Sequence, residues 1–391
     1  MKVCYFGTYR ATYSRNVNMI EGLRRAGVEV IECHVPLWLG IEDRVAATKG
    51  GWKRPAFWVR VLKAYFQLLA EYFKIKDYDV LVVGYPGQFD VYLAWVLAWF
   101  KRKPLVWDVF MSIYLIALER ELDQKSKGTV EILRRVERLA LRLPNLLIHD
   151  TEDYVAWLVE THGVAPERFR LVPTGADDRV FHPQDSILSE VRTRTPEALA
   201  KSKDASPEIF RVVYFGTFIP NHGVSKIIEA ARLLADVTDV QFEMIGEGPE
   251  REGAETLTRA YGLQNVAFLG WMEHDALSAR VGQAQVCLGA FGETPQSLMT
   301  VQNKIFTGLA LGVPVLSGDS PAVRRAFVHK EHLYLCARSG AGIVAGIKAL
   351  RADAALRARL AKNGYEIFRG QYDLEHLGEL FAYHLREVAM L

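Results

Sequence analysis

The sequence is poor in cysteine and has neither a long apolar run nor a large net charge. Its four cysteines form no CxxC pair and no Cys/His spacing, which argues against a zinc or redox motif. We read them as small buried residues in a reducing compartment. The opening MKVCYFG is too short for a signal peptide, and the apolar run at 91–100 has about half the length of a membrane-spanning helix. These absences predict a cytosolic protein, with contact to a membrane surface as the alternative left open.

Charge of one sign is also lacking. The 391 residues carry 48 Lys and Arg against 46 Asp and Glu, a net charge of +2. A nucleic-acid partner is therefore not expected, because such proteins carry a clear basic excess. Half of the residues are apolar, and the length suits two domains of about 150 to 200 residues each.

The first half alternates strand-like and helix-like segments. The strand-like runs are continuous and apolar, which is typical of a parallel sheet covered on both faces. They are KVCYFG, VEVIECHV, DVLVVGYPG, PLVWDVF, NLLIHD and RFRLVPTG. We predict a Rossmann-like, doubly wound domain over residues 1–183.

The pattern stops at a polar stretch and then restarts. Residues 184–208 hold few large apolar side chains and read as a linker or insertion. A second domain is predicted over 209–371, with a helix at about 372–391 packing back on the first domain. Its strand-like runs are FRVVYFG, VQFEMIGEG, NVAFLG, QVCLGAF and VPVLSGD. Ligands of such sheets bind beyond the carboxyl ends of the strands, so the cleft between two such domains is the expected site.

The second half resembles the retaining glycosyltransferases of family 4. The resemblance rests on YFGTFIPNHGVSKIIEAARLL, FEMIGEGPERE, NVAFLGWMEHDAL and NKIFTGLALGVPVLSGDSPAVRR, in the family's order and spacing, and on VPTGAD in the first half. It implies the α/β GT-B architecture, two Rossmann-like domains facing across a cleft. It also implies transfer of a sugar from a nucleotide-sugar donor, with retention, without a metal or other cofactor, and with the departing phosphate oxygen as the base.

Several donor-site positions depart from the family's pattern. The family carries arginine after a glycine and a Lys-Gly pair further on, where this chain has Gly216 with Thr217 and His222 with glycine. The family's two glutamates eight positions apart become Met299 and Thr307, so Thr307 stands at the ribose-binding position.

Replacement cations are therefore needed to hold the donor's diphosphate. Lys304 starts a helix whose amino end favours anions, and we assign it to leaving-group stabilisation, against a solvated lysine as the alternative. His222 contacts the same phosphates or simply lies in a loop. Gly246 and Gly248 follow a strand, at a place where the backbone can approach a phosphate, and we predict that they contact the donor. The alternative is that they only form a tight turn. Trp271 and Met272 occupy the segment that lies against the base in the family, against a place in the core.

The first half is expected to bind the acceptor. Asp108 follows a strand and is assigned to orienting an acceptor hydroxyl, against a helix cap. Phe110 stands where the family more often has histidine. Further contacts to acceptor or phosphate are predicted for Arg10, Arg15, Asn16 and Asp177. The alternative for each is an ordinary surface ion pair or a role in a turn. No Ser/His/Asp constellation or His-rich cluster is present.

A basic and aromatic segment spans residues 44–74. Between Arg44 and Ala70 it has six Lys or Arg and no acidic residue. Basic charge beside aromatic side chains suits an anionic membrane, but a Rossmann helix must also bury an apolar face. Peripheral membrane contact and burial both stay open.

The sequence thus predicts a hexosyltransferase-type enzyme with a glycan, lipid-linked or small-molecule acceptor. Two alternatives remain. One is a non-catalytic GT-B protein that binds a nucleotide or glycan, and the other is a nucleotide-sugar epimerase or hydrolase of the same fold.

Overall fold

The chain folds into two compact domains. The computed structural model describes residues 1–37, 55–183 and 209–390. The N-terminal domain comprises Met1–Thr174 and Leu374–Leu391, and the C-terminal domain comprises Gly175–Asp373. The predicted linker at 184–208 and residues 44–54 of the basic segment lie outside the described residues.

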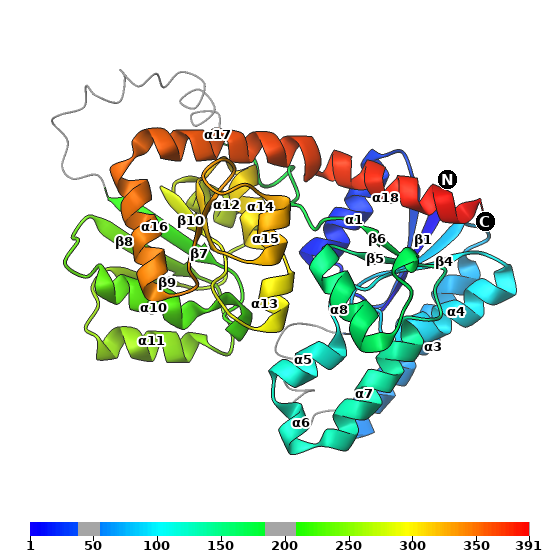
Figure 1. Cartoon of the computed structure of the whole chain (residues 1–391). Helices are drawn as coiled ribbons and strands as arrows, with labels where there is room; N and C mark the ends of the chain where they lie inside the picture. Colours follow the sequence, from blue (N-terminus) through cyan, green and yellow to red (C-terminus); the bar gives the residue numbers. More distant parts are fainter. Residues whose placement is uncertain (38–54, 184–208, 391) are drawn as a thin grey trace. The chain divides into compact units, whose positions relative to one another are not determined.

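The N-terminal domain is built on one parallel sheet in the order β2-β1-β3-β4-β5-β6 (Figure 1). Short runs of Val, Leu and Ile favour strands because their side chains pack on both faces of a covered sheet. The strands are β1 (Lys2–Gly7), β2 (Glu29–His34), β3 (Val80–Val83), β4 (Leu105–Asp108), β5 (Leu146–His149) and β6 (Phe169–Leu171). The helices are α1 (Ser14–Arg25), α3 (Pro55–Lys74), α4 (Asp90–Lys101), α5 (Ile113–Glu119), α6 (Leu122–Lys125), α7 (Lys127–Ala140), α8 (Glu152–His162) and α18 (Leu374–Ala389).

The last helix of the chain belongs to the N-terminal domain. α18 packs along α1, and residues of both helices share one core cluster with β1 and β3. The crossing is close because glycines meet there: a Cβ on Gly378 would lie 1.8 Å from the Gly22 carbonyl oxygen. A larger residue at either position would force the helices apart.

The C-terminal domain holds a second parallel sheet, in the order β12-β11-β10-β7-β8-β9. The strands are β7 (Phe210–Phe215), β8 (Val240–Ile245), β9 (Val266–Leu269), β10 (Val286–Leu288), β11 (Val315–Gly318) and β12 (Tyr334–Cys336). The helices are α10 (Val224–Leu233), α11 (Arg251–Ala260), α12 (His274–Gly282), α13 (Pro295–Met299), α14 (Asn303–Ala310), α15 (Pro321–Ala326), α16 (Gly340–Ala352) and α17 (Ala354–Gln371).

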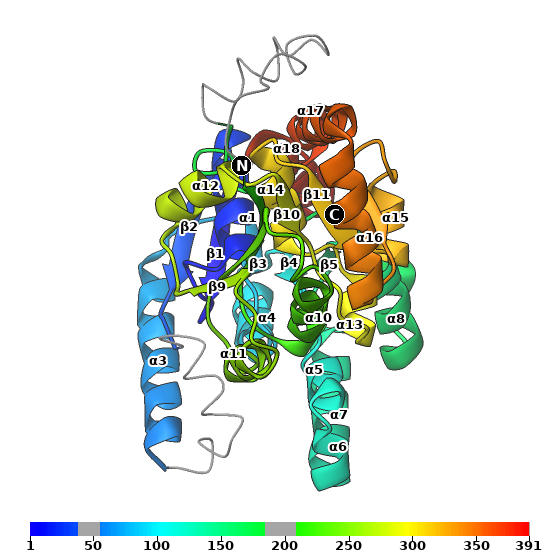
Figure 2. The same ribbon diagram turned by 90° about the vertical axis from the view of Figure 1, so that its left-hand side faces the viewer.

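Helices cover both faces of the second sheet. α10 and α16 lie side by side on one face, as both views show, and share a core cluster with β7, β8 and β10 (Figure 2). α14 and α17 pack with a second cluster on the other face. The predicted α/β fold with two doubly wound domains is confirmed, while the strand β12 was not predicted.

Three further features bear on the sequence predictions: the domain boundary, the cysteines and the hydropathy of the helices. Residues 175–183, assigned from the sequence to the first domain, pack in the C-terminal domain, because Ala176 and Phe181 are buried in its core. All four cysteines are free thiols; three are buried, and Cys336 is half-buried. Within the described parts of the chain, no helix is both long and apolar enough to cross a membrane.

Candidate active site

The carboxyl edge of the C-terminal sheet has its topological switch point between β7 and β10. The chain builds β8 and β9 on one side of β7, and β10, β11 and β12 on the other. Loops at such a point diverge, which leaves a place for a ligand. The loop after β7 begins at Gly216, whose φ of +126° strains any other residue, and it continues to His222.

Lys304 reaches this loop from the first turn of α14. A Cβ built on Gly216 would lie 3.6 Å from Nζ of Lys304, and the same Nζ lies 4.8 Å from the ring centre of Tyr214. Lys304 is buried, and Nζ has no hydrogen-bond partner among the residues described. Burial lowers the pKa of Lys304 to about 7. A buried, unpartnered ammonium is costly, so this site has an unmet demand for an anion.

The amino end of α14 adds to that demand. No side chain caps the helix among the described residues, and of its first-turn N–H groups only that of Ile305 has a printed acceptor, the Gln302 carbonyl at 2.9 Å. The helix dipole adds positive potential at the same end. Lys304 and the helix end therefore favour the same kind of ligand, an oxyanion.

His222 stands beside Lys304 but has a different role from the predicted one. Nδ1 of His222 lies 2.6 Å from the Thr217 carbonyl oxygen and 2.9 Å from the Tyr214 hydroxyl. A carbonyl only accepts, so Nδ1 carries the proton and Nε2 is left as an acceptor. Burial, and then the charge of Lys304, hold the pKa of His222 well below its usual value. A neutral histidine in this tautomer does not donate to phosphate, which corrects that assignment.

Thr217 is also a framework residue. Its carbonyl oxygen accepts from the Tyr214 hydroxyl at 3.1 Å and lies within reach of His222, so its backbone fixes the loop. The replacement of the family's arginine by Thr217 thus leaves Lys304 as the cation placed beside Gly216.

The paired glycines after β8 serve loop packing. A Cβ on Gly246 would lie 2.2 Å from the Gly216 carbonyl oxygen, and one on Gly248 would lie 2.5 Å from the Phe218 nitrogen. The two loops are also joined by the Phe218 N–H, which donates to Glu247 O at 2.9 Å. These glycines let two backbones touch, which explains them without a phosphate, and the predicted phosphate contact stays a prediction.

The remaining donor-site candidates differ in exposure. Thr307 is buried one turn after Lys304 on α14, so both residues face the same side of the helix. Trp271 is exposed, whereas Met272 packs partly against the core of the domain. Contact of Trp271 and Met272 with a base stays a prediction.

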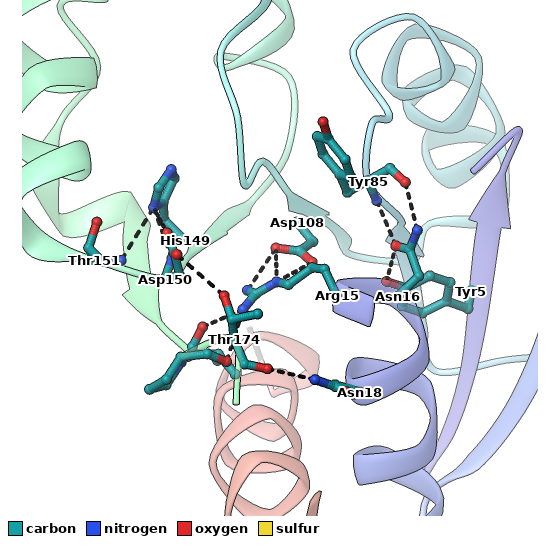
Figure 3. A network of polar contacts seen from close by, with 12 residues as sticks. Tyr5, Arg15, Asn16, Asn18, Tyr85, Asp108, His149, Asp150, Thr151 and Thr174 are labelled. Carbon is teal, nitrogen blue, oxygen red and sulfur yellow. Dashed lines mark hydrogen bonds and ion pairs between the residues drawn. The ribbon is translucent and has the colours of Figure 1, made fainter. Parts of the chain in front are cut away.

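In the N-terminal domain, the Asp108 carboxylate forms an ion pair with Arg15 of the same domain (Figure 3). Its carboxylate accepts from Nε of Arg15 at 2.9 Å and from the Nη2 group of Arg15 at 2.9 Å. The Nη1 group of Arg15 donates to the carbonyls of Val172 and Pro173 at 2.7 and 2.9 Å. Burial favours the neutral form of Arg15, but the Asp108 carboxylate raises its pKa above the usual value.

This arrangement corrects two assignments. Asp108 is not set up to orient an acceptor hydroxyl, and Arg15 is not set up to bind a phosphate, because each satisfies the other. The pair instead ties α1 to the end of β4 and to the segment after β6. It is a framework ion pair, and removing either member would leave a buried charge.

Two other polar candidates in this group also hold the backbone. The side-chain oxygen of Asn16 accepts from the Tyr85 N–H at 3.0 Å, and its amide donates to the Tyr85 carbonyl at 2.8 Å. Asp177 lies in the C-terminal domain, where its carboxylate accepts from the backbone and guanidinium of Arg179 in a turn. Both are corrected from ligand binding to loop fixation. Arg10 lies with its guanidinium 5.8 Å from the Tyr13 ring centre, and its predicted role stays a prediction.

The end of β5 carries a buried polar group formed by His149 and Asp150. Nδ1 of His149 lies 2.8 Å from the Asp150 nitrogen and 2.9 Å from Oδ1 of Asp150, and on the first contact, with the N–H donating to Nδ1, we assign the proton to Nε2. Nε2 is buried, with no hydrogen-bond partner among the described residues. Asp150 accepts from the Thr174 hydroxyl at 3.3 Å (Figure 3). His149 was missed because its position inside a strand gave it no motif.

Arg338 was missed as well. Its guanidinium donates to the Asp319 carbonyl at 2.7 Å and to the carbonyl of Gly292 and the hydroxyl of Ser297. It thereby fixes the loops after β10 and β11, which lie at the carboxyl edge of the same sheet. No spacing in the sequence relates Arg338 to these loops.

A metal site is not formed by the residues described, where no group of three or more His, Cys, Asp or Glu side chains gathers. Asp77 and Asp79 form an Asp-x-Asp sequence, but they precede β3 at its amino end. Asp77 pairs with Lys103 at 3.1 Å, and Asp79 accepts from the Lys2 N–H at 2.7 Å.

Comparison with known proteins finds similarity to sugar-transferring enzymes. Residues 209–353 match the family model "Glycosyl transferases group 1". The lipopolysaccharide core biosynthesis glycosyltransferase LpsD of Rhizobium meliloti is 29% identical over 189 residues, 48% of this chain and 52% of that protein. The alpha-D-kanosaminyltransferase of Streptomyces kanamyceticus is 26% identical over 274 residues, 63% of this chain and 67% of that protein. The match thus spans only about half the length of LpsD.

Solved structures show the fold of the whole chain. Anabaena HepE in complex with UDP has a TM-score of 0.69 at 15% identity, covering 99% of this chain and 100% of that one. Sucrose-phosphate synthase from Thermosynechococcus elongatus has a TM-score of 0.69 at 16% identity, covering 99% and 98%. The chain therefore has the GT-B fold, and its residues 209–353 are similar to the glycosyl transferases group 1 family.

Proposed function

We propose that this protein is a hexosyltransferase-type glycosyltransferase whose C-terminal domain binds a nucleotide-sugar donor. The observation that carries the proposal is the buried, unpartnered ammonium of Lys304 beside Gly216 at the switch point of the sheet. A nucleotide diphosphate supplies the negative charge that this ammonium lacks. The names of LpsD and of the kanosaminyltransferase support sugar transfer as the reaction.

Lys304 stabilises the leaving group. When the bond between the sugar and the diphosphate breaks, negative charge grows on the terminal phosphate oxygen. A cation in a site shielded from water stabilises that charge far more than one in solution. The bound diphosphate in turn raises the pKa of Lys304, so the lysine is charged when the donor is present. The proposed step uses Lys304 and the helix end of α14 and assigns no metal.

Other residues of the C-terminal domain recognise the rest of the donor. The Thr307 hydroxyl is placed one turn along α14 to contact the ribose, where the family's pattern has glutamate. Trp271 and Met272 are assigned to the base. We extend the proposal to family 4 chemistry with retention, in which the departing phosphate oxygen removes the acceptor's proton.

The acceptor is assigned to the N-terminal domain. Because Asp108 and Arg15 satisfy each other, His149 and Asp150 replace them as the groups that contact an acceptor hydroxyl. Nε2 of His149 is the available donor, and Asp150 supplies a carboxylate. Glycans, lipid-linked saccharides and small molecules with hydroxyl groups all fit this chemistry. The four free thiols favour action in the reducing cytosol.

The test is binding followed by turnover. Calorimetry with the full chain measures affinity for UDP, GDP, ADP, dTDP and CDP, and then release of nucleotide from their sugar conjugates with and without acceptors. We expect one nucleotide to bind, release to depend on acceptor, and a chelator to have no effect. In Lys304→Met, affinity for that nucleotide should fall by about 100-fold, as expected for a lost buried ionic contact.

A second function is a GT-B protein that binds a nucleotide or glycan without catalysis. It is favoured by the neutral state of His222, which leaves Lys304 as the one cation beside Gly216 among the described residues. The same experiment separates the two functions, because a binding protein would hold the nucleotide sugar without consuming it. An absence of binding across the whole panel would contradict both nucleotide functions and leave glycan binding as the function to test.

A further inference from the structure

Helix α3 of the N-terminal domain exposes an apolar face that is distinct from its buried face. The buried residues Ala64, Leu68 and Tyr72 recur every four positions and pack on the domain. Trp58, Leu62 and Phe66 form another series at the same spacing and are exposed. The two series are offset by two residues, which is about 200° around a helix, so they point in nearly opposite directions.

The polar residues of α3 form a third stripe. Lys63, Gln67 and Glu71 are exposed and follow the apolar series by one residue, or about 100°. Helix α3 therefore buries one apolar face and leaves its other, aromatic face exposed. Phe66 and Phe73 remain 71% and 73% exposed, and they are not needed for the core that Leu68 and Tyr72 complete.

Helix α4 continues this exposed apolar character beside α3. Trp95, Val96, Trp99 and Phe100 are exposed, with Trp99 at 66% and Phe100 at 72%. No charged residue occurs from 91 to 100. The two helices are joined by a 2.7 Å hydrogen bond from the Tyr65 hydroxyl to Asp90.

The ends of these helices connect in the same way. Nζ of Lys101 donates to the carbonyls of Ile75 and Lys76 at 3.1 and 3.2 Å. The outer faces of α3 and α4 thus belong to neighbouring helices of one domain. Monomeric soluble proteins rarely expose so many large apolar side chains on adjacent elements, which marks an interaction surface.

Basic side chains border the aromatic ones. Residues 55–103 hold seven Lys or Arg against four Asp or Glu. Of the four acids, Asp90 is buried, Glu71 pairs with Lys74, and Asp77 pairs with Lys103. The two pairs also neutralise Lys74 and Lys103, and the five other cations of this range stand against Asp79 and the buried Asp90, so its net charge is positive. That combination favours an anionic lipid surface over an acidic protein groove, because tryptophan and cationic side chains both settle at the boundary of head groups and acyl chains.

A cavity at the end of α4 has the same composition. It measures ≈ 620 Å³ and is lined by aromatic, cationic and amide side chains that include Trp95, Trp99, Phe100, Arg102, Lys103 and Asn145. Its aromatic wall suits an acyl chain and its cations suit a phosphate.

We propose that α3 and α4 form a membrane-docking surface that rests on anionic phospholipid, with Trp58, Leu62, Phe66, Phe73, Trp99 and Phe100 entering the interface. Arg102 lies at the phosphate level. The docking does not depend on the proposed sugar transfer, because none of these residues belongs to the donor site. It adds a reason to favour a lipid-linked acceptor, since docking raises the effective concentration of such acceptors.

The test is flotation of the full chain with vesicles of phosphatidylcholine, with and without phosphatidylglycerol. The wild type should float with the anionic vesicles and lose binding at high salt. The double variant Trp99→Gln/Phe100→Gln should bind about tenfold more weakly, because two large apolar contacts with the interface are lost. Arg102→Gln should weaken binding to anionic vesicles by about fivefold and leave phosphatidylcholine binding unchanged.

The matched control is Tyr261→Gln, which replaces an exposed aromatic residue of the C-terminal domain. It should bind vesicles as the wild type does. The proposal is overturned if the wild type does not bind anionic vesicles, or if the double variant binds them equally well. It is also overturned if sedimentation velocity shows a dimer that the double variant dissolves while vesicle binding is absent. Nucleotide binding, measured in parallel, reports separately on the donor site.

Discussion

The two domains share a Rossmann-like plan but treat the switch points of their sheets differently. In the N-terminal domain the switch lies between β1 and β3, and the chain joins the two loops with its own polar groups. The Thr8 N–H donates to Asp90 at 2.7 Å, and Asn16 bonds the backbone of Tyr85. In the C-terminal domain the switch lies between β7 and β10, and there Lys304 remains without a hydrogen-bond partner among the described residues.

The difference shows how one fold separates scaffold from site. A buried charge that is paired, such as Arg15 with Asp108, fixes loops and has no spare valence for a ligand. A buried charge that is unpaired costs stability and gains it back only from a ligand. Burial alone does not distinguish the two cases, since Arg15, Asp108 and Lys304 are all buried. The presence or absence of a partner among the described residues distinguishes them.

The largest expected effect is a loss of stability at the paired charge. Asp108→Asn should lower the free energy of unfolding by about 3 kcal/mol, because it leaves the Arg15 guanidinium buried without its counter-ion. Thermal and urea unfolding of the full chain measure this. The control is Arg15→Met/Asp108→Leu, which removes both charges and should cost clearly less. Equal losses in the two variants would mean that the pair is held by shape and not by charge.

Removing the unpaired charge of Lys304 should increase the stability of the fold, in contrast to the loss expected at Asp108. Lys304→Met should raise the free energy of unfolding by about 2 kcal/mol at pH 7, because the pKa of Lys304 lies below its unfolded value. The folded state binds fewer protons than the unfolded state between about pH 7 and 10.5, so wild-type stability rises across that window. The gain from the substitution should therefore shrink as the pH is raised. A destabilised variant at pH 7 would contradict the unmet charge.

Two glycines of the C-terminal domain allow a test of whether a missing side chain serves backbone packing or leaves space for a ligand. Gly246 and Gly216 have nearly the same φ, +124° and +126°, so alanine brings similar strain at both. Only at Gly246 does the new Cβ meet a backbone atom, at 2.2 Å. Gly246→Ala should cost about 3 kcal/mol and Gly216→Ala about 1 to 2 kcal/mol, as thermal unfolding would measure. Similar losses would refute the role of Gly246 in packing the loops.

The proposed nucleotide site should depend on pH. Lys304 in the free protein has a pKa of about 7, and a bound diphosphate raises it, so binding takes up a proton above neutral pH. Affinity for UDP, the nucleotide bound to HepE, should fall by about tenfold between pH 7.5 and 9. His222 stays neutral in this range and adds nothing. Calorimetry in buffers of different ionisation enthalpy detects the proton directly, and Lys304→Met should show neither effect.

The smallest effect concerns Thr307. Thr307→Val keeps the shape of the side chain and removes the hydroxyl, which should weaken nucleotide diphosphate binding by about fivefold. Competition by inorganic pyrophosphate should stay unchanged, because pyrophosphate has no ribose. A loss that is equal for both ligands would place Thr307 at the phosphates and contradict its assignment to the ribose.

The fold followed from the sequence because its signals are local. Apolar runs such as DVLVVGYPG and FRVVYFG are closed by glycine and repeat in both halves, which suffices for two parallel sheets. β12 was missed because Tyr334–Cys336 is only three residues long. Lys304 was found from its place at a helix start, a feature that one short stretch of sequence contains.

The other assignments failed where they depended on partners far apart in the chain. Arg15 and Asp108 are 93 residues apart, and Arg338 contacts Gly292, 46 residues earlier, and Asp319, 19 residues earlier. No sequence spacing shows that such groups satisfy each other. The same holds for Gly246, whose need for a missing side chain comes from the backbone of Gly216.

The sequence by itself determined the strands, the helices, the division into two halves and the family resemblance, because hydrophobic periodicity and short motifs are properties of neighbouring residues. Only the tertiary structure decided which polar groups are paired and which are not. It assigned Asp108 and Arg15 to the framework, left Lys304 with no hydrogen-bond partner in the described parts of the chain, and exposed the aromatic faces of α3 and α4. The physical reason is that the free energy of a buried charge or an exposed ring depends on what surrounds it, and folding brings those surroundings from distant parts of the chain.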